Sequence, residues 1–292
     1  MKLSIVIPSF NKGVYVEDCV KSLLNQTIPI DEIIIVDDNS TDGSWERISN
    51  IFATVPNVLL IRHQKNKGQA SARNTGLNMM SGDIVAFVDA DDVVASDFSS
   101  RVREAFSLPE VQVFRWQSCH YNDGRLFDPV PVRYMHKPNL AAFYTGLWGG
   151  GSVAARLSCL RGLQFDYSLR NFEDFFFWVL VVDSMSNNQI SLGARSIYKV
   201  RSQQTTLRAS FGFDQQRAIN VVIAFRKLKL NGDVSKASAS RMGLVIMRWL
   251  LMNAKLGLAA NVFMHSIAKF GLSRLFFVLL AIIFRRFYRY SI

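Results

Sequence analysis

The chain has 292 residues, of which 49% are hydrophobic and 20% are charged. This composition excludes a disordered, collagenous or low-complexity protein, and the length suffices for one large domain or two modest ones. Its three cysteines, Cys19, Cys119 and Cys159, are far apart and form no CxxC pattern. The sequence therefore supports neither a disulfide framework nor a zinc module, and it favours a reducing compartment, the cytoplasm.

The net charge of +11 is unevenly distributed along the chain. Residues 1–194 carry 17 Lys and Arg against 21 Asp and Glu, whereas residues 195–292 carry 17 Lys and Arg against two Asp. A strongly basic region favours an anionic partner, either nucleic acid or a phospholipid surface. Leu275–Phe284 is an unbroken apolar run, which favours the membrane and argues against nucleic acid. Its ten residues are fewer than the roughly 20 that a bilayer-spanning helix needs.

Short apolar runs and amphipathic segments alternate over the first hundred residues. The runs predict strands at Leu3–Ile7, Glu32–Val36, Val58–Ile61 and Ile84–Val88, and the segments between them predict helices at Val14–Gln26, Ser44–Phe52 and Gln69–Met80. Strands that are apolar throughout and separated by helices indicate a parallel sheet with both faces covered. Ligands bind at the carboxyl ends of the strands in such sheets.

The second half of the chain is less regular. Val111–Gln117 predicts a strand, Trp148–Ser152 is a glycine-rich turn or part of a binding site, and Glu173-Asp174 opens an apolar helix, Phe175–Val182. Beyond about residue 205 the pattern is helical and basic, with helices predicted at Val221–Leu228, Met242–Met252 and Leu275–Tyr290. The four histidines, His63 among them, show no metal-ligand spacing, so we expect them to be surface or hydrogen-bonded core residues.

Acidic clusters follow two of the predicted strands. In Asp89-Ala90-Asp91-Asp92, residues i and i+2 can point into one crevice, and two carboxylates suit Mg²⁺ or Mn²⁺, with a diphosphate completing the coordination. A solvated acidic turn or a helix cap is the alternative interpretation. The run Asp37–Ser44 offers a carboxylate for a base or ribose, or only a capping loop. Arg73 follows Gly68 at a predicted helix start, which suits an anion site or a pair with an acidic residue.

These motifs together resemble glycosyltransferase family 2. The segments Ile5–Asn11, Asp37–Ser44, Gly68–Gly76, Asp89–Asp92 and Glu173-Asp174 have the order and spacing of that family over roughly residues 1–205. The resemblance implies the GT-A fold, an α/β architecture with a mostly parallel sheet flanked by helices, and inverting transfer from a nucleotide-sugar donor. Residues 206–292 would then be a basic helical extension.

The resemblance also implies roles for individual residues. Donor-binding residues would be Pro8, Ser9, Asn11, Asp38, Arg73, Asp89 and, in a looser match, Arg201. Asp38 would read the base, Asp91 would be the direct ligand of Mn²⁺ or Mg²⁺, and Asp89 would assist it nearer the ribose. Asp174 would be the general base.

Two other classes of protein compete with this interpretation. A nucleotidyltransferase that makes a nucleotide-sugar would need a glycine-rich basic loop after the first strand, and Ile7–Gly13 is not that loop. A catalytically inactive membrane scaffold would be expected to lack Asp91 or Asp174, and the chain has both. The family resemblance favours a UDP-sugar donor. The basic apolar tail favours a lipid-linked glycan acceptor, as in bacterial surface polysaccharide assembly, at the inner face of the cell membrane.

Overall fold

The structure, a computed structural model, describes most of the first two thirds of the chain. The described residues are 1–122, 125–126, 153–160, 162–169, 173–183, 185–201, 215–227 and, singly, Gly243, Ile246, Ala259, Asn261 and Val262. By its internal contacts the chain divides into two units, Met1–Thr206 and Leu207–Ile292. The sheet and the candidate site described below belong to the first unit.

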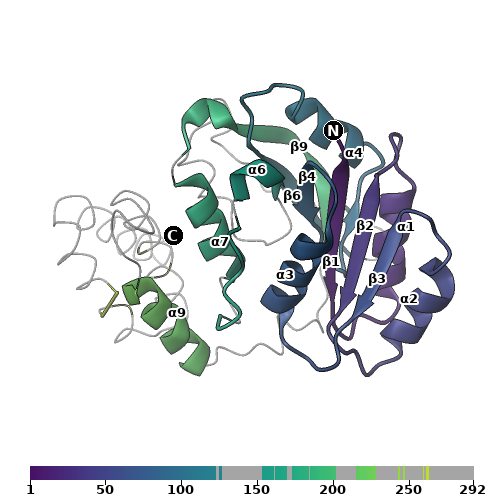
Figure 1. The fold of residues 1–292 in the computed structure, drawn as a ribbon, viewed down its shortest axis with the longest axis horizontal. Coiled ribbons are helices and arrows are strands. Elements are labelled where there is room, and N and C mark those ends of the chain that lie inside the picture. Colours follow the sequence, from purple (N-terminus) through teal and green to yellow (C-terminus); the bar gives the residue numbers. More distant parts are fainter. Residues whose placement is uncertain are drawn as a thin grey trace, which may run out of the picture. The chain divides into compact units, whose positions relative to one another are not determined.

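Four parallel strands form one half of the sheet. They are β1 (Leu3–Ser9), β2 (Glu32–Asp37), β3 (Val58–Arg62) and β4 (Ile84–Phe87), in the order β3-β2-β1-β4 (Figure 1). Every residue of β1 and β4 is buried, because helices cover both faces of a sheet of this kind. The four strands predicted from apolar runs are therefore confirmed, with ends that differ by at most two residues.

The other half of the sheet is mixed, and most of it was not predicted. Next to β4 come β8 (Val153–Arg156), β6 (Val113–Asn122), β9 (Ile190–Arg201) and β5 (Val93–Val94), with β7 (Arg125–Leu126) paired to β6. β8 is antiparallel to both β4 and β6, and β9 is parallel to β6. The predicted fold class, a mostly parallel sheet flanked by helices, is thus confirmed, and the antiparallel pairings lie in this second half.

Helices cover the two faces of the parallel half (Figure 1). On one face, α1 (Tyr15–Leu24), α2 (Ser44–Phe52) and α4 (Phe98–Ala105) contribute to a core with Ile5 and Ile7 of β1. Successive residues of a strand point to opposite faces, so Val6 faces the other side, where α3 (Gln69–Met79) packs. Phe87 of β4 faces α7 (Glu173–Val182) on the side of α3, and its ring centroid lies 6.2 Å from that of Trp178.

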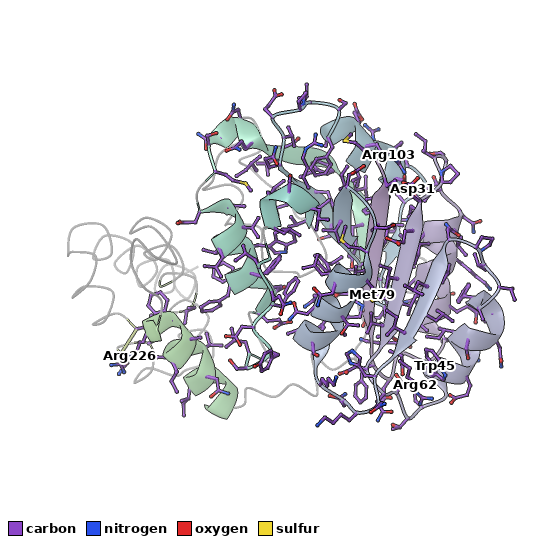
Figure 2. All side chains as sticks on the ribbon, viewed as in Figure 1. Asp31, Trp45, Arg62, Met79, Arg103 and Arg226 are labelled. Carbon is purple, nitrogen blue, oxygen red and sulfur yellow. The ribbon has the colours of Figure 1, made fainter. Side chains whose placement is uncertain are left out.

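The two ends of the parallel strands are marked by different side chains (Figure 2). At the amino ends, Arg103 of α4 donates to Asp31 at 2.6 Å. At the carboxyl ends, the guanidinium of Arg62, the last residue of β3, lies 5.4 Å from the ring centroid of Trp45 in α2. The candidate site lies at the carboxyl ends of the strands.

The remaining described elements are short or lie in the second unit. They are α6 (Leu157–Leu160), a 3₁₀ turn (Asn187–Gln189) and α9 (Gln215–Lys227), which overlaps the helix predicted over Val221–Leu228. The predicted loop at Trp148–Ser152 and the predicted helix Leu275–Tyr290 lie outside the described residues, as does nearly all of Met242–Met252. Among the described residues, no helix is both long and apolar enough to span a bilayer.

Candidate active site

Loops after β1 and β2 meet at the carboxyl edge of the sheet. The backbone N–H of Asp38 donates to the carbonyl of Ser9 at 2.8 Å, and the backbone N–H of Asn11 donates to Ser40 Oγ at 2.9 Å. Asn11 has a φ of 50°, a conformation that asparagine tolerates better than most residues, and its Oδ1 accepts from Thr41 N–H at 2.8 Å. Asn11 thus joins the first two loops of the predicted donor site.

Pro8 and Ser9 form the end of β1 inside this edge. Pro8 is buried and pairs in register with Val36 of β2. The Ser9 side chain is 1% exposed, and its Oγ has no hydrogen-bond partner among the described residues. Both residues were predicted to line the donor site. They lie at the carboxyl end of β1, and their contact with a donor stays a prediction.

The carboxylate of Asp38 is fully engaged inside the protein. It accepts from the backbone N–H groups of Lys67 and Gly68 at 2.9 and 2.7 Å, and it lies 2.7 Å from His63 Nδ1. His63 Nε2 in turn lies 2.9 Å from Thr75 Oγ1 on α3. Asp38 therefore fixes the loop before α3, while its predicted contact with a base stays a prediction. His63 is a hydrogen-bonded core residue, as expected, but its partner could not be predicted from spacing.

The two predicted metal ligands each have a cationic neighbour. Asp89 Oδ1 accepts from Arg73 Nη2 at 3.1 Å and from Gln69 Nε2 at 3.2 Å, and Asp91 Oδ2 lies 2.6 Å from Lys12 Nζ. The side chains of Asp89 and Asp91 are 25% and 18% exposed, so solvent reaches both.

The donor set of this pair suits a hard divalent cation. Asp89 and Asp91 offer carboxylate oxygens, the atom type that Mg²⁺ and Mn²⁺ prefer. Within the described part of the chain no group of three His, Cys, Asp or Glu could hold a metal ion. Two carboxylates match a site that a diphosphate completes, so the residues present fit the implied metal.

Asp92 is the buried member of the acidic turn. Burial, then the charges of Asp89 and Asp91, raise its pKa to about 8. Its Oδ1 accepts from the backbone N–H of Arg201 at 2.9 Å, and its neighbour Tyr198 accepts from the N–H of Asp89 at 2.9 Å. The turn is therefore held against β9, an element that the sequence analysis did not predict.

Arg201 lies at this turn, at the end of β9. Its Nε donates to the carbonyl of Asp91 at 3.1 Å, its Nη2 donates to Asp18 at 2.9 Å, and its guanidinium lies 4.8 Å from the ring centroid of Tyr15. The loose match that suggested Arg201 for the donor site thus selected a residue beside the acidic pair. Its contact with a phosphate stays a prediction.

Arg73 connects the acidic turn to α7. Its side chain is 2% exposed, Nη2 donates to Asp89, and Nη1 donates to Glu173 at 2.9 Å, across 100 residues of sequence. Burial alone would lower the pKa of Arg73, but the charges of Asp89, Glu173 and Asp174 raise it. Of the two interpretations of Arg73, pairing with acidic residues is the one observed.

Asp174 lies at the start of α7, next to the residue that Arg73 holds. Burial and the charge of Glu173 raise its pKa to about 7, while Arg73 opposes the shift. Its Oδ1 accepts from the N–H of Phe175 at 2.7 Å. A carboxyl group with this pKa exchanges protons near neutral pH, which is what a general base requires.

Aromatic packing and one asparagine join α7 to α3. The rings of Phe165 and Phe177 stack with centroids 3.9 Å apart, and Trp178 packs edge-on against Phe177. Asn74 of α3 donates to the carbonyl of Phe165 and accepts from its N–H, both at 2.8 Å. The Phe165 ring centroid lies 5.5 Å from the guanidinium of Arg73. This packing sets the position of Glu173 and Asp174 relative to the sheet.

The chain belongs to glycosyl transferase family 2, whose family model matches residues 4–172, more than half of its length. Glycosyltransferase GlyG of Streptococcus pneumoniae is 43% identical over 123 residues, which is 42% of this chain and 40% of that protein. The uncharacterized glycosyltransferase EpsJ of Bacillus subtilis is 40% identical over 145 residues, which is 47% of this chain and 41% of that protein. The matches thus span less than half of these relatives.

Solved structures show that the fold is GT-A. The structure of S. aureus TarS 1–349 in complex with UDP-GlcNAc has a TM-score of 0.69 at 19% identity, over 86% of this chain and 73% of that one. The mannosyltransferase PcManGT of Pyrobaculum calidifontis, in complex with GDP-Man and Mn²⁺, has a TM-score of 0.60 at 19% identity, over 96% and 79%. At these identities the likeness concerns the fold.

Proposed function

We propose that this protein is an inverting glycosyltransferase that moves a sugar from a nucleotide-sugar donor to an acceptor hydroxyl. The observation that carries the proposal is the Arg73 bridge, which ties the Asp89–Asp91 pair to the helix start that bears Asp174. Two features are thereby held together in one site. The first is an acidic pair that suits a metal–diphosphate, and the second is the carboxyl group of Asp174, whose pKa is about 7.

The acidic pair would serve the leaving group. Asp91 would hold Mn²⁺ or Mg²⁺ with help from Asp89, and the metal would supply Lewis-acid stabilisation of the charge that grows on the departing diphosphate. The nucleotide site would be shaped by four residues at the carboxyl ends of β1 and β2. Pro8 and Ser9 end β1, and Asn11 and Asp38 lie in the loops that follow the two strands.

Asp174 would take the proton of the attacking hydroxyl. Its carboxylate must be ionised to accept that proton, and a pKa of about 7 leaves a large ionised fraction at neutral pH. Attack by the acceptor oxygen on the anomeric carbon forms one bond, and the bond to the diphosphate oxygen breaks. A single displacement with a single base inverts the configuration.

The donor we propose is a UDP-sugar, and the acceptor a lipid-linked glycan at the inner face of a membrane. UDP-GlcNAc in the TarS complex supports the first, although GDP-Man in PcManGT leaves other nucleotides to be tested. The basic residues 195–292, with their apolar run, support the second.

A donor screen that measures nucleotide release tests the proposal, with membrane lipid extracts as acceptor. We expect release that chelation abolishes and Mn²⁺ or Mg²⁺ restores, and that Asp91→Ala lowers by at least about a hundredfold. Asp97→Ala is the matched control, because Asp97 is an exposed carboxylate paired with Arg101 outside the site. Full activity in excess chelator would remove the metal from the mechanism, and no transfer from any donor would favour an inactive scaffold.

A further inference from the structure

Lys12 forms an ion pair with the carboxylate proposed as the direct metal ligand. Its Nζ lies 2.6 Å from Asp91 Oδ2, and both side chains are 18% exposed. Lys12 is not among the site residues predicted from the sequence. The ammonium of Lys12 occupies Oδ2 of Asp91, and a divalent cation bound at the same carboxylate would be repelled by it.

The backbone of Lys12 is anchored, whereas its side chain reaches the site through a flexible stem. Its N–H donates to Ser44 Oγ at 3.1 Å, and its carbonyl accepts from Tyr15 N–H at 3.0 Å. The next residue, Gly13, has a φ of 49° and donates to Ser44 Oγ at 2.7 Å. The ammonium group can therefore change partner by side-chain rotation, with no movement of the loop.

The two cations beside the acidic pair differ in how freely they can move. Arg73 is 2% exposed and is held by Asp89 and Glu173 at once, so its removal would leave the buried carboxylate of Glu173 without this partner. Lys12 contacts Asp91 as a single point charge at a half-buried position that solvent still reaches. If a metal–diphosphate bound at Asp91, Lys12 would be the cation that could be displaced, and the phosphate oxygens would offer it another anionic partner.

We propose that Lys12 is a donor-binding residue that neutralises Asp91 in the empty site and transfers its contact to the diphosphate when metal and nucleotide bind. This inference rests on the proposed function and adds a residue to it. Lys12 would weaken metal binding in the absence of nucleotide and strengthen nucleotide binding in the presence of metal. Lys12 would thus lower the affinity for the metal alone and raise the affinity for the nucleotide.

Titrations of the full chain measure these two affinities separately from activity. Calorimetry measures Mn²⁺ binding without nucleotide, and then UDP binding at saturating Mn²⁺, for wild type, Lys12→Met and Lys12→Arg. We expect Lys12→Met to bind Mn²⁺ about three- to tenfold more tightly, because a competing ion pair is gone, and to bind UDP about tenfold more weakly. Lys12→Arg keeps the charge and should recover most of the UDP affinity.

Lys21→Met is the matched control. Lys21 pairs with Glu17 at the same 2.6 Å, but on the surface of α1 and away from the acidic turn, so neither constant should change. If wild type binds Mn²⁺ and UDP and Lys12→Met does not shift the two constants in opposite directions, the inference is wrong and the proposed function stands. If wild type binds neither, both are wrong.

Discussion

At the level of single residues, Arg73 and Lys12 neutralise acidic side chains at the carboxyl ends of the strands. Three aspartates crowd one turn, and the protein responds in three ways: Asp89 pairs with Arg73, Asp91 pairs with Lys12, and Asp92 has a pKa raised to about 8. The raised pKa follows from burial beside two like charges. A divalent cation would relieve the same repulsion, which is the physical reason to expect one there.

The first prediction at this scale concerns the base. Asp174→Asn should retain UDP binding and lose transfer by about 10²- to 10⁴-fold, because asparagine cannot accept the proton. In wild type the rate should rise with pH through about 7, since the ionised form of Asp174 is present above its pKa and lost below it. Pre-steady-state transfer measured across pH checks both, and Asp174→Asn should lose that dependence. A deeper loss in Glu173→Gln would assign the base to Glu173.

The second prediction concerns the stability of the Arg73 bridge. Arg73→Met should lower the free energy of unfolding by about 3–5 kcal/mol, because Glu173 and Asp89 lose a buried partner. Urea unfolding of the isolated protein measures the change. Glu173→Gln on the same background should recover part of it, since the unpaired charge is then removed. Arg101→Met, at an exposed pair, should change it by less than about 1 kcal/mol. Equal losses at the two arginines would contradict this.

At the scale of elements, α3 connects the sheet to the helix start that bears Glu173 and Asp174. It begins after Gly68, whose φ of 91° favours glycine, and it carries Arg73, Asn74 and Thr75 toward three different partners. Gly76 lets it approach β1, because a Cβ there would lie 2.3 Å from Val6 Cγ1. The apolar pattern of this helix is weak, so its polar partners and its close packing hold it in place.

Close packing at Gly76 leads to the third prediction. Gly76→Ala should destabilise the protein by about 1–3 kcal/mol, although alanine favours helices, because the new methyl group overlaps Val6. Thermal unfolding of the single variant and of the double variant with Val6→Ala measures it, and the second change should recover part of the loss. Asn78→Ala, at an exposed position of the same helix, is the control. Greater stability in Gly76→Ala would show that α3 can shift without cost.

The strands divide into those that local patterns predicted and those that they did not. β1, β2 and β4 are runs of β-branched and apolar residues that are buried almost throughout, and β3 is a similar apolar run that is only half-buried. One segment carries such a pattern by itself. β9 contains Gly193 and Arg195, which interrupt its apolar alternation. Gly193 is required by its neighbour, since a Cβ there would lie 2.9 Å from the ring of Phe114. The interruption therefore has a tertiary cause that the sequence of β9 alone does not reveal.

On the scale of the whole molecule, charge and hydropathy separate the two ends of the chain. The acidic residues that would bind the metal lie in the first unit, and the excess of basic residues lies beyond 194. Each basic residue near an anionic surface contributes on the order of 1 kcal/mol of binding. Apolar residues such as those of Leu275–Phe284 would add to this at the headgroup boundary.

The fourth prediction is that this basic region binds anionic membranes. Full-length protein should sediment with anionic liposomes and not with neutral ones, and a chain ending at Gly271 should lose most of this binding. Replacing Arg285, Arg286 and Arg289 by Gln should weaken it, whereas replacing Lys2, Lys21 and Lys65 by Gln should not. Equal binding by the full and shortened chains would contradict membrane docking, and resistance to both high salt and alkaline carbonate would indicate a membrane span.

The sequence by itself determined the parallel strands, their helices and the polar residues that follow the strands, because periodicity and strand-end composition are local properties. It also contained the motifs that resemble glycosyltransferase family 2, and the family model confirms that membership over residues 4–172. Only the tertiary structure decided which charges neutralise one another: Arg73 with Glu173 across 100 residues, Lys12 with Asp91 across 79, and His63 with Asp38 across 25. Ionic and hydrogen-bond partners depend on where loops from different strands meet, and burial at that meeting point raises the pKa of Asp92 and of Asp174. No local pattern encodes either.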